Sequence, residues 1–331
     1  MEIFFHDNQL IYDPKLEFSG TNIKPYSDPP ERIMRIRKSL EESSLDIDFK
    51  IPEICNYKDL NSVHSTDYLK FLKNIPEGIS PTAPISFPYP NYRNKQNSSF
   101  TSKIGSYFFD PSTPIDGDTF TSALSSASSA LECAKTLVHK DVVVALCRPP
   151  GHHAMRGVGG GYCFLNNVAI AANKLLEYTK NISILDIDFH HGNGTQEIFY
   201  KTSNVQYVSI HGNPDIYYPF YWGSKEEIGE GEGKNFNINY PVANSTTDDD
   251  YNKVLNESLL KITEYDPKFI LVSLGLDCYF KDPVGGMKLS LKYYKEIGKK
   301  LSKFPKIGIF LEGGYSEDVG KCFVNVLENL E

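Results

Sequence analysis

Five short apolar runs, rich in β-branched residues, restrict the folds available to this chain more than any other feature. They span Val142–Leu146, Ile182–Ile187, Val205–Ile210, Phe269–Leu274 and Ile307–Leu311. Helical patterns lie between some of them, at Thr119–Lys140, Phe164–Tyr178, Thr247–Tyr265 and Ser290–Lys303. Buried strands that alternate with helices are typical of a parallel sheet with helices on both faces. The sequence therefore predicts an α/β fold with an open, mainly parallel sheet and, since no linker separates the units, a single domain over residues 1–331.

Charge and composition exclude several classes of function. The net charge is −8 and the pI is about 5.6, which argues against a nucleic-acid partner, because phosphate binding needs clustered Lys and Arg. No run reaches the apolar length of a membrane span, and residues 1–13 lack the basic and apolar regions of a signal peptide. The six scattered cysteines form no C-x-x-C pair, so we expect buried free thiols and a reducing cytoplasm.

Unusual polar residues follow each of the five predicted strands. They are RPPGHH (148–153), DIDFHHGNGT (186–195), His211-Gly212, GLDCYFKDP (275–283) and EGGYS (312–316). In open α/β sheets, ligands bind outside the carboxyl ends of the strands. These residues therefore predict one converging site. The acidic triplet 248–250, by contrast, opens a helical pattern, where carboxylates favour the positive end of the helix dipole.

Three of these residues are candidate metal ligands. Asp188 and His190 are two apart on an extended segment, so their side chains point to the same side. Asp277, at a neighbouring strand end, could complete the set. Three protein ligands leave room for water and substrate, as a catalytic zinc ion needs. The adjacent pair His152-His153 follows a rigid Pro-Pro-Gly turn, which fits a general base and a general acid beside such a metal.

Glycines surround these residues. Gly157, Gly159, Gly160 and Gly161 let the backbone approach a ligand closely, and Gly313-Gly314 places Tyr315 where its phenol could donate a hydrogen bond to an oxyanion. The glycines at 157–161 do not have the spacing of a dinucleotide-binding loop, and GEGEGK (229–234) does not have the spacing of a Walker loop.

Taken together, RPPGHH, GGYCFLNN (160–167), LDIDFHHGNGTQ (185–196), SLGLDCYFKDP (273–283) and LEGGYS (311–316) resemble the zinc deacetylases of the arginase–deacetylase superfamily. Within them the chain looks most like the acetylpolyamine amidohydrolases. The resemblance implies an arginase/deacetylase fold and metal-dependent hydrolysis of linear N-acetyl amides. Acetylated polyamines such as acetylputrescine or acetylcadaverine are the first expected substrates, and acetyl-lysine in proteins or peptides is the alternative.

The resemblance also implies roles for individual residues. Asp188, His190 and Asp277 would bind Zn²⁺, with Fe²⁺ as the other candidate. His152 would lean on Asp186 and His153 on Asn193, and which histidine is the general base stays open. Tyr315 would polarise the carbonyl, and Gly161, Tyr162 and Tyr218 would line the substrate tunnel. A structural K⁺ would lie near Asp186 and Ser209, using backbone carbonyls around Asp188, His190 and Ile210.

The segment 76–118 departs from the regular pattern. It is rich in Pro, Ser, Thr and Asn, and it holds the aromatic residues Phe87, Tyr89, Tyr92, Phe100, Tyr107, Phe108 and Phe109. We expect a long loop insertion whose exposed aromatics form a homodimer interface and narrow the mouth of the active site. A narrow mouth favours a small, cationic, acetylated amine. Thr101 and Ser112, however, stand where related polyamine enzymes carry acidic residues, and Asp110, Asp116 and Asp118 are displaced from those positions.

Two other functions fit the sequence less well. A ureohydrolase shares the fold, but it would need further aspartates for a second metal, and the third motif offers only Asp277 before Tyr279. An inactive binding module would be expected to lack some of the ligands, the histidine pair or the tyrosine, all of which are present.

Overall fold

The computed structural model describes residues 1–19, 22–79 and 100–330. Within them, one sheet has the strand order β4-β1-β5-β10-β9-β6-β7-β8, and every neighbouring pair in it is parallel. Its strands are β1 (Glu2–Phe4), β4 (Asp48–Lys50), β5 (Val142–Ala145), β6 (Ile182–Asp186), β7 (Val205–Gly212), β8 (Asn237–Val242), β9 (Phe269–Leu274) and β10 (Ile307–Leu311). A separate antiparallel hairpin pairs β2 (Leu16–Ser19) with β3 (Asn22–Pro25).

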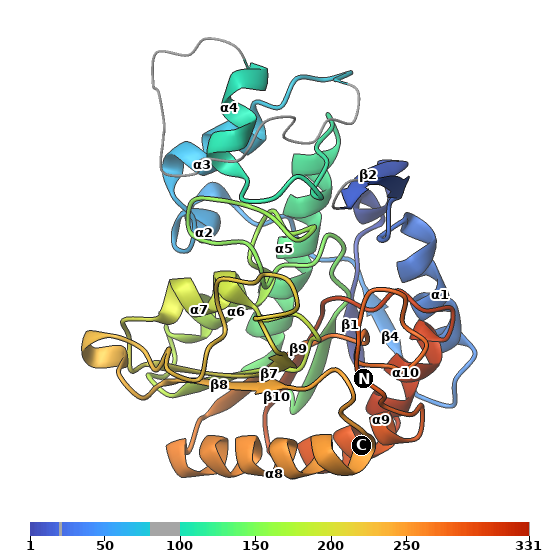
Figure 1. The fold of residues 1–331 in the computed structure, drawn as a ribbon, viewed down its shortest axis with the longest axis vertical. Coiled ribbons are helices and arrows are strands. Elements are labelled where there is room, and N and C mark those ends of the chain that lie inside the picture. The colour runs from blue at the N-terminus through green and yellow to red at the C-terminus, as the bar shows by residue number, and fades with distance from the viewer. Residues whose placement is uncertain (20–21, 80–99, 331) are drawn as a thin grey trace.

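Helices cover both faces of the sheet. They are α1 (Pro30–Glu41), α2 (Tyr57–Asn61), α3 (Thr66–Lys73), α4 (Phe100–Tyr107), α5 (Thr119–Leu137), α6 (Asn167–Leu175), α7 (Asn193–Phe199), α8 (Asp248–Tyr265), α9 (Tyr293–Leu301) and α10 (Val319–Leu327). Figure 1 shows α8 and α9 on one side of the sheet and α6 and α7 on the other.

The core divides into two apolar clusters, one on each face, because side chains alternate along a strand. In β5, Val143 and Ala145 pack into the cluster built with α5 and α6, whereas Val144 packs into the one built with α1, α8, α9 and α10. Burying each large apolar side chain contributes about 1.5–3 kcal/mol, so strands buried on both faces fix the sheet strongly. The predicted α/β fold with a parallel sheet is therefore confirmed.

The predicted elements match the structure closely. All five predicted strands are present, and so are the four helices, although α6 begins at Asn167 rather than Phe164. Its start follows from Asn166, whose side chain accepts from the N–H of Ala169 and caps the helix. The triplet Asp248–Asp250 lies in the first turn of α8, as predicted.

Part of the expected loop insertion over 76–118 is helical. Phe100–Tyr107 forms α4, and Phe71 of α3 stacks on both Phe100 and Tyr107. Phe108 is fully buried, so the described aromatics pack inside the chain rather than projecting from it. Phe87, Tyr89 and Tyr92 lie outside the described residues.

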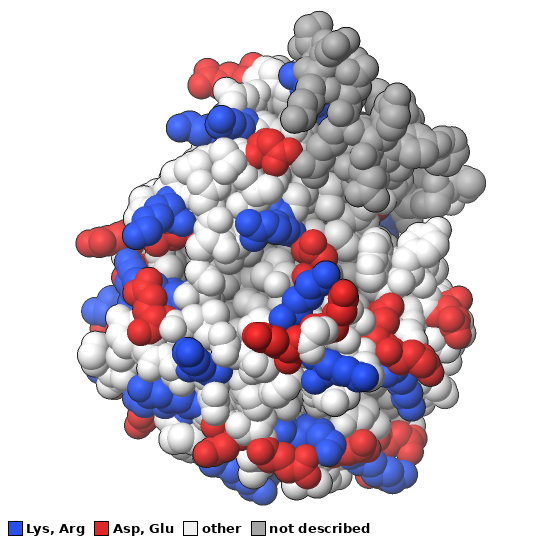
Figure 2. Space-filling view, turned by 90° about the vertical axis from the view of Figure 1, so that its left-hand side faces the viewer, with Lys and Arg blue, Asp and Glu red and all other residues white. Residues whose placement is uncertain are grey.

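Three further features of the described residues concern the cysteines, the apolar character of the helices and the surface charge. All six cysteines are buried free thiols. Across the described chain, no helix is long and apolar enough to cross a membrane. On the face drawn in Figure 2, the basic and acidic side chains of the described residues are interspersed rather than separated into fields of one sign.

Candidate active site

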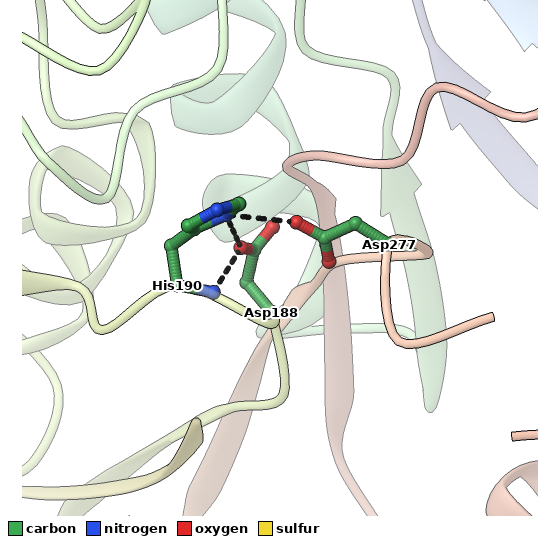
Figure 3. A group of neighbouring side chains, drawn as sticks. All are labelled: Asp188, His190 and Asp277. Atoms are coloured by element: carbon green, nitrogen blue, oxygen red, sulfur yellow. Dashed lines mark hydrogen bonds and ion pairs between the residues drawn. The ribbon is translucent and has the colours of Figure 1, made fainter. Parts of the chain in front are cut away.

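The three predicted metal ligands meet at the carboxyl edge of the sheet. Asp188 and His190 follow β6 and Asp277 follows β9, the neighbouring strand (Figure 3). One ligand atom from each residue lies within 4.8 Å of the others. His190 Nδ1 is 3.0 Å from Asp277 Oδ2 and 3.4 Å from Asp188 Oδ1.

Backbone N–H groups orient the two carboxylates. Phe189 N–H donates to Asp277 Oδ1 at 2.8 Å, and Gly313 N–H donates to Asp188 Oδ2 at 2.8 Å. Burial together with the charge of Asp188 raises the pKa of Asp277 to about 7. Two buried carboxylates and one imidazole, held this close, fit a divalent cation, which would balance the charge that burial penalises.

The two adjacent histidines have different partners. His152 Nδ1 is 3.1 Å from Asp186 Oδ2, and His153 Nδ1 is 2.7 Å from Asn193 Oδ1, the two contacts that the resemblance implied. Burial lowers the pKa of His152, but the charges of Asp186 and Asp188 outweigh it and raise this pKa to about 10. Burial and the neighbouring His152 hold the pKa of His153 well below its usual range. The pKa values of the two rings are thus shifted in opposite directions.

Tyr315 lies beside the three ligands. A methyl group placed on Gly313 would be 2.7 Å from Asp188 Oδ2, 3.0 Å from Asp277 Oδ2 and 3.3 Å from the Tyr315 hydroxyl, so all three atoms surround one point. Burial raises the pKa of Tyr315 well above its usual value, which keeps the phenol protonated as a hydrogen-bond donor. The neighbouring Gly314 has φ +115°, a conformation that permits the turn behind the tyrosine.

The predicted tunnel residues lie against His153. The Tyr218 ring is 5.0 Å from the His153 ring, and a methyl group on Gly161 would be 2.3 Å from His153 Cδ2. The Tyr162 ring contacts the Tyr315 ring edge-on at 5.9 Å, and its hydroxyl donates to Glu17 at 2.9 Å. Gly161, Tyr162 and Tyr218 are therefore placed together with the predicted catalytic residues.

Two carboxylates that support this site were assigned no role from the sequence. Glu312, fully buried, accepts from the N–H of Gly151 at 2.7 Å and of His152 at 3.1 Å, and from the Ser273 hydroxyl at 3.0 Å. Asp282 accepts from the N–H of Tyr315 at 2.6 Å. Both lie inside motifs that the sequence singled out, and for Glu312, which directly follows β10, an acid at the end of a buried strand was the available signal.

The residues named for a potassium site are also neighbours. Asp186 and Ser209 are paired across β6 and β7, and Asp188, His190 and Ile210 follow within a few residues. The carboxylate of Asp186 is already used by His152 and by the Tyr207 hydroxyl, which donates to it at 2.9 Å.

Comparison with known proteins identifies the family. Residues 26–330 match the histone deacetylase domain. This chain belongs to the histone deacetylase family. Membership confirms both the resemblance seen in the sequence and the prediction of an enzyme that hydrolyses amides.

Bacterial relatives match this chain over its full length. The acetylpolyamine amidohydrolase of Mycoplana ramosa is 35% identical over 342 residues, covering 100% of this chain and 99% of the relative. Acetylpolyamine amidohydrolase 2 of Pseudomonas aeruginosa is 33% identical over 341 residues, covering 100% and 99%. The crystal structure of the acetylpolyamine aminohydrolase from Burkholderia pseudomallei superposes with a TM-score of 0.92 at 30% identity, covering 100% of this chain and 98% of that one.

Proposed function

We propose that this chain is a metal-dependent deacetylase that hydrolyses the acetyl amide of a small, linear, cationic amine. The observation that carries the proposal is the meeting of three metal-ligand side chains, a histidine pair and a buried tyrosine at one edge of the sheet. Acetylated polyamines such as acetylputrescine and acetylcadaverine are the proposed substrates, because the full-length relatives bear that name.

Asp188, His190 and Asp277 would hold the metal, with Zn²⁺ proposed and Fe²⁺ as the alternative. Such a cation supplies Lewis acidity to a water molecule and to the amide carbonyl. A structural K⁺ is proposed near Asp186 and Ser209, together with the backbone carbonyls of Asp188, His190 and Ile210.

The histidine pair would move the proton. Asn193 Oδ1 accepts from His153 Nδ1–H, and His153 Nε2 has no hydrogen-bond partner among the described residues. Neutral His153 is therefore the proposed base, which takes a proton from the attacking water at Nε2 and returns it to the amine nitrogen as the C–N bond breaks. His152, held protonated by Asp186, would stabilise the negative charge of the transition state. The products are acetate and the free amine.

Tyr315 would donate its phenol hydrogen to the carbonyl oxygen as negative charge develops there. Asp282 holds the N–H of Tyr315 and of Ser316 at 2.6 and 3.0 Å, and Glu312 holds the backbone that carries His152. These two carboxylates position the donor and the histidine pair relative to each other.

A specific observation favours acetyl-lysine peptides as the second candidate substrate. Thr101 is exposed on α4, where an acidic residue would attract a polyamine tail. Asp110 and Asp116 are already engaged with internal donors, including Ser112 and Thr119. Asp118 is exposed and its side chain makes no helix-cap hydrogen bond, so of the three aspartates in the segment 100–118 it is the one left to attract a second ammonium group.

The test is a substrate panel on metal-depleted and zinc-reconstituted protein. We expect the reconstituted protein to release acetate from acetylputrescine and acetylcadaverine with higher kcat/KM than from acetyl-lysine peptides, and the depleted protein to release none. The reverse order of substrates would support the second candidate. No acetate from any acetyl amide by fully metallated protein would contradict the proposal.

A further inference from the structure

The buried carboxylate of Asp110 lies between the end of α4 and the candidate active site. It is 7% exposed. Oδ1 accepts from Ser112 N–H at 2.7 Å, from the Ser112 hydroxyl at 2.6 Å and from the Thr113 hydroxyl at 3.1 Å. Oδ2 accepts from Gly161 N–H at 2.7 Å and from the Tyr218 hydroxyl at 2.9 Å. A carboxylate with five donors has little capacity left for a substrate ammonium group.

The two donors on Oδ2 belong to two residues of the proposed tunnel that lie beside His153. A methyl group placed on Gly161 would be 2.3 Å from His153 Cδ2 and 2.9 Å from the Tyr218 hydroxyl, and the Tyr218 ring stands nearly perpendicular to the same imidazole, at 87° and 5.0 Å between ring centres. One carboxylate oxygen therefore joins the backbone of Gly161 to the side chain of Tyr218. The spacing of these two groups beside the proposed base depends on this shared acceptor.

The wall that contains Gly161 also needs support, because its backbone is in an unfavourable conformation. Gly161 has φ +56° and Tyr162 has φ +67°, and left-handed backbone is costly for a residue with a side chain. Tyr162 N–H donates to the Thr113 hydroxyl at 3.0 Å, and that hydroxyl donates to Asp110. Asp110 thus anchors both consecutive N–H groups, one directly and one through Thr113.

We propose that Asp110 is a positioning residue that sets the width of the acyl-amine tunnel by fixing Gly161 and Tyr218 relative to each other beside His153. The inference rests on the proposed function, since it takes these residues as tunnel walls. It assigns to Asp110 a role that is different from attracting the cationic tail of the substrate. The carboxylate acts through its acceptor geometry, so substrates of the same shape should depend on it equally, whatever their charge.

Asp110→Asn tests this role. An amide has one acceptor oxygen, so its NH₂ group must face either Gly161 N–H or Ser112 N–H, and one backbone donor loses its partner. We expect kcat/KM to fall about tenfold or more, the usual scale for a lost hydrogen bond to a charged group. The fall should be the same for acetylputrescine and for neutral N-acetylpentylamine, which has the same length with a methyl group in place of the ammonium group, and metal content should stay at the wild-type level.

Tyr218→Phe provides a second, independent variant, because it removes only the hydroxyl that donates to Asp110. We expect it to lower kcat/KM on acetylputrescine by about threefold, on the scale of one hydrogen bond. In the double variant, kcat/KM should fall by less than the product of the two single fold-losses, because both substitutions remove the same contact. A merely structural role of Asp110 would give independent losses.

Asp116→Asn is the matched control. Asp116 lies on the same segment, but it accepts from the Thr119 hydroxyl and from Asp118 N–H, away from the tunnel walls. The Asp116→Asn variant should therefore keep the wild-type kcat/KM. The inference would be overturned by wild-type kcat/KM in Asp110→Asn, by a loss confined to the cationic substrate, by loss of metal, or by independent effects in the double variant. A wild-type protein that holds metal but cleaves no acetyl amide would instead contradict the proposed function.

Discussion

The phenol of Tyr315 is the residue whose proposed role is easiest to isolate, because removing one oxygen atom leaves its packing intact. Burial keeps the phenol protonated, and Asp282 fixes its backbone. We expect Tyr315→Phe to lower kcat by about 10² or more, as the loss of one oxyanion donor typically does. Metal content and unfolding midpoint should remain at the wild-type level. An unchanged kcat would make Tyr315 an ordinary core residue.

The metal assignment is tested at Asp277, whose two carboxylate oxygens face His190 and Phe189 N–H. Asp277→Ala removes one of three ligands, so we expect both the bound metal and the activity to be lost. Metal content is measured by elemental analysis after dialysis. Asp248→Asn, which changes an acid at the start of α8 that binds Ser290, should keep both. Full metal occupancy in Asp277→Ala would contradict the ligand assignment.

Residue-level prediction worked where spacing along one segment decides position. Asp188 and His190 are two apart after a strand, so their proximity could be inferred from the chain alone. Glu312, Asp282 and Asp110 were not assigned roles, because each acts on backbone donors from distant segments. Glu312 binds the N–H of His152, 160 positions away in sequence. No local pattern encodes which buried N–H group will face a given carboxylate.

At the scale of elements, the predicted strands were those with runs of five or six mostly apolar residues, which the structure buries on both faces. β1 and β4 have three residues each, too few for a hydrophobic period to be visible. β8 (NINYPV) mixes Asn with apolar residues and lies at the edge of the sheet, where β7 alone of the described strands pairs with it. Short and edge strands take their conformation from the sheet they join, which is a tertiary effect.

His64 joins the segment between α2 and α3 to the loops around the site. Its Nδ1–H donates to the Met155 carbonyl at 3.0 Å, and its Nε2 accepts from Asn166 N–H at 2.9 Å. An acceptor at Nε2 requires the neutral ring, and burial lowers the pKa of His64 to about 4. In the unfolded chain a histidine has a pKa of about 6.5. The folded state therefore binds this proton more weakly.

This difference predicts acid sensitivity. Neutral His64 contributes about 3 kcal/mol to the free energy of unfolding. This contribution is fully present above about pH 6.5 and is lost as the pH falls toward 4. In His64→Gln, we expect lower stability than wild type at pH 7 but a smaller further loss on acidification. Urea unfolding of both proteins, metal-depleted, at pH 7, 5.5 and 4.5 measures this. Parallel stability curves would show that His64 does not titrate in this range.

At the scale of the whole molecule, the described aromatics of the segment 76–118 are used inside the chain. Phe100 and Tyr107 stack on Phe71, Phe108 is buried, and α3 and α4 lie together at one end of the molecule (Figure 1). A deletion that reached residue 108 would remove core contacts and could not report on assembly alone. The proposed homodimer therefore rests on Phe87, Tyr89 and Tyr92, outside the described residues.

A replacement confined to residues 84–97 separates assembly from folding, since it spares α4, Phe108 and Asp110. A Gly/Ser linker in place of these residues keeps the ends connected without contributing apolar surface. Because aromatic residues are enriched in interface cores, we expect the intact protein to be a dimer and the variant a monomer by light scattering.

If the same residues also narrow the mouth of the site, the variant should gain kcat/KM on acetyl-lysine peptides relative to acetylputrescine, because a peptide backbone needs room at the rim that a polyamine does not. Metal content and unfolding midpoint, compared with wild type, control for damage to the fold. A monomeric intact protein would remove the interface role, and an unchanged substrate ratio in a monomeric variant would show that the segment assembles the enzyme without shaping its specificity.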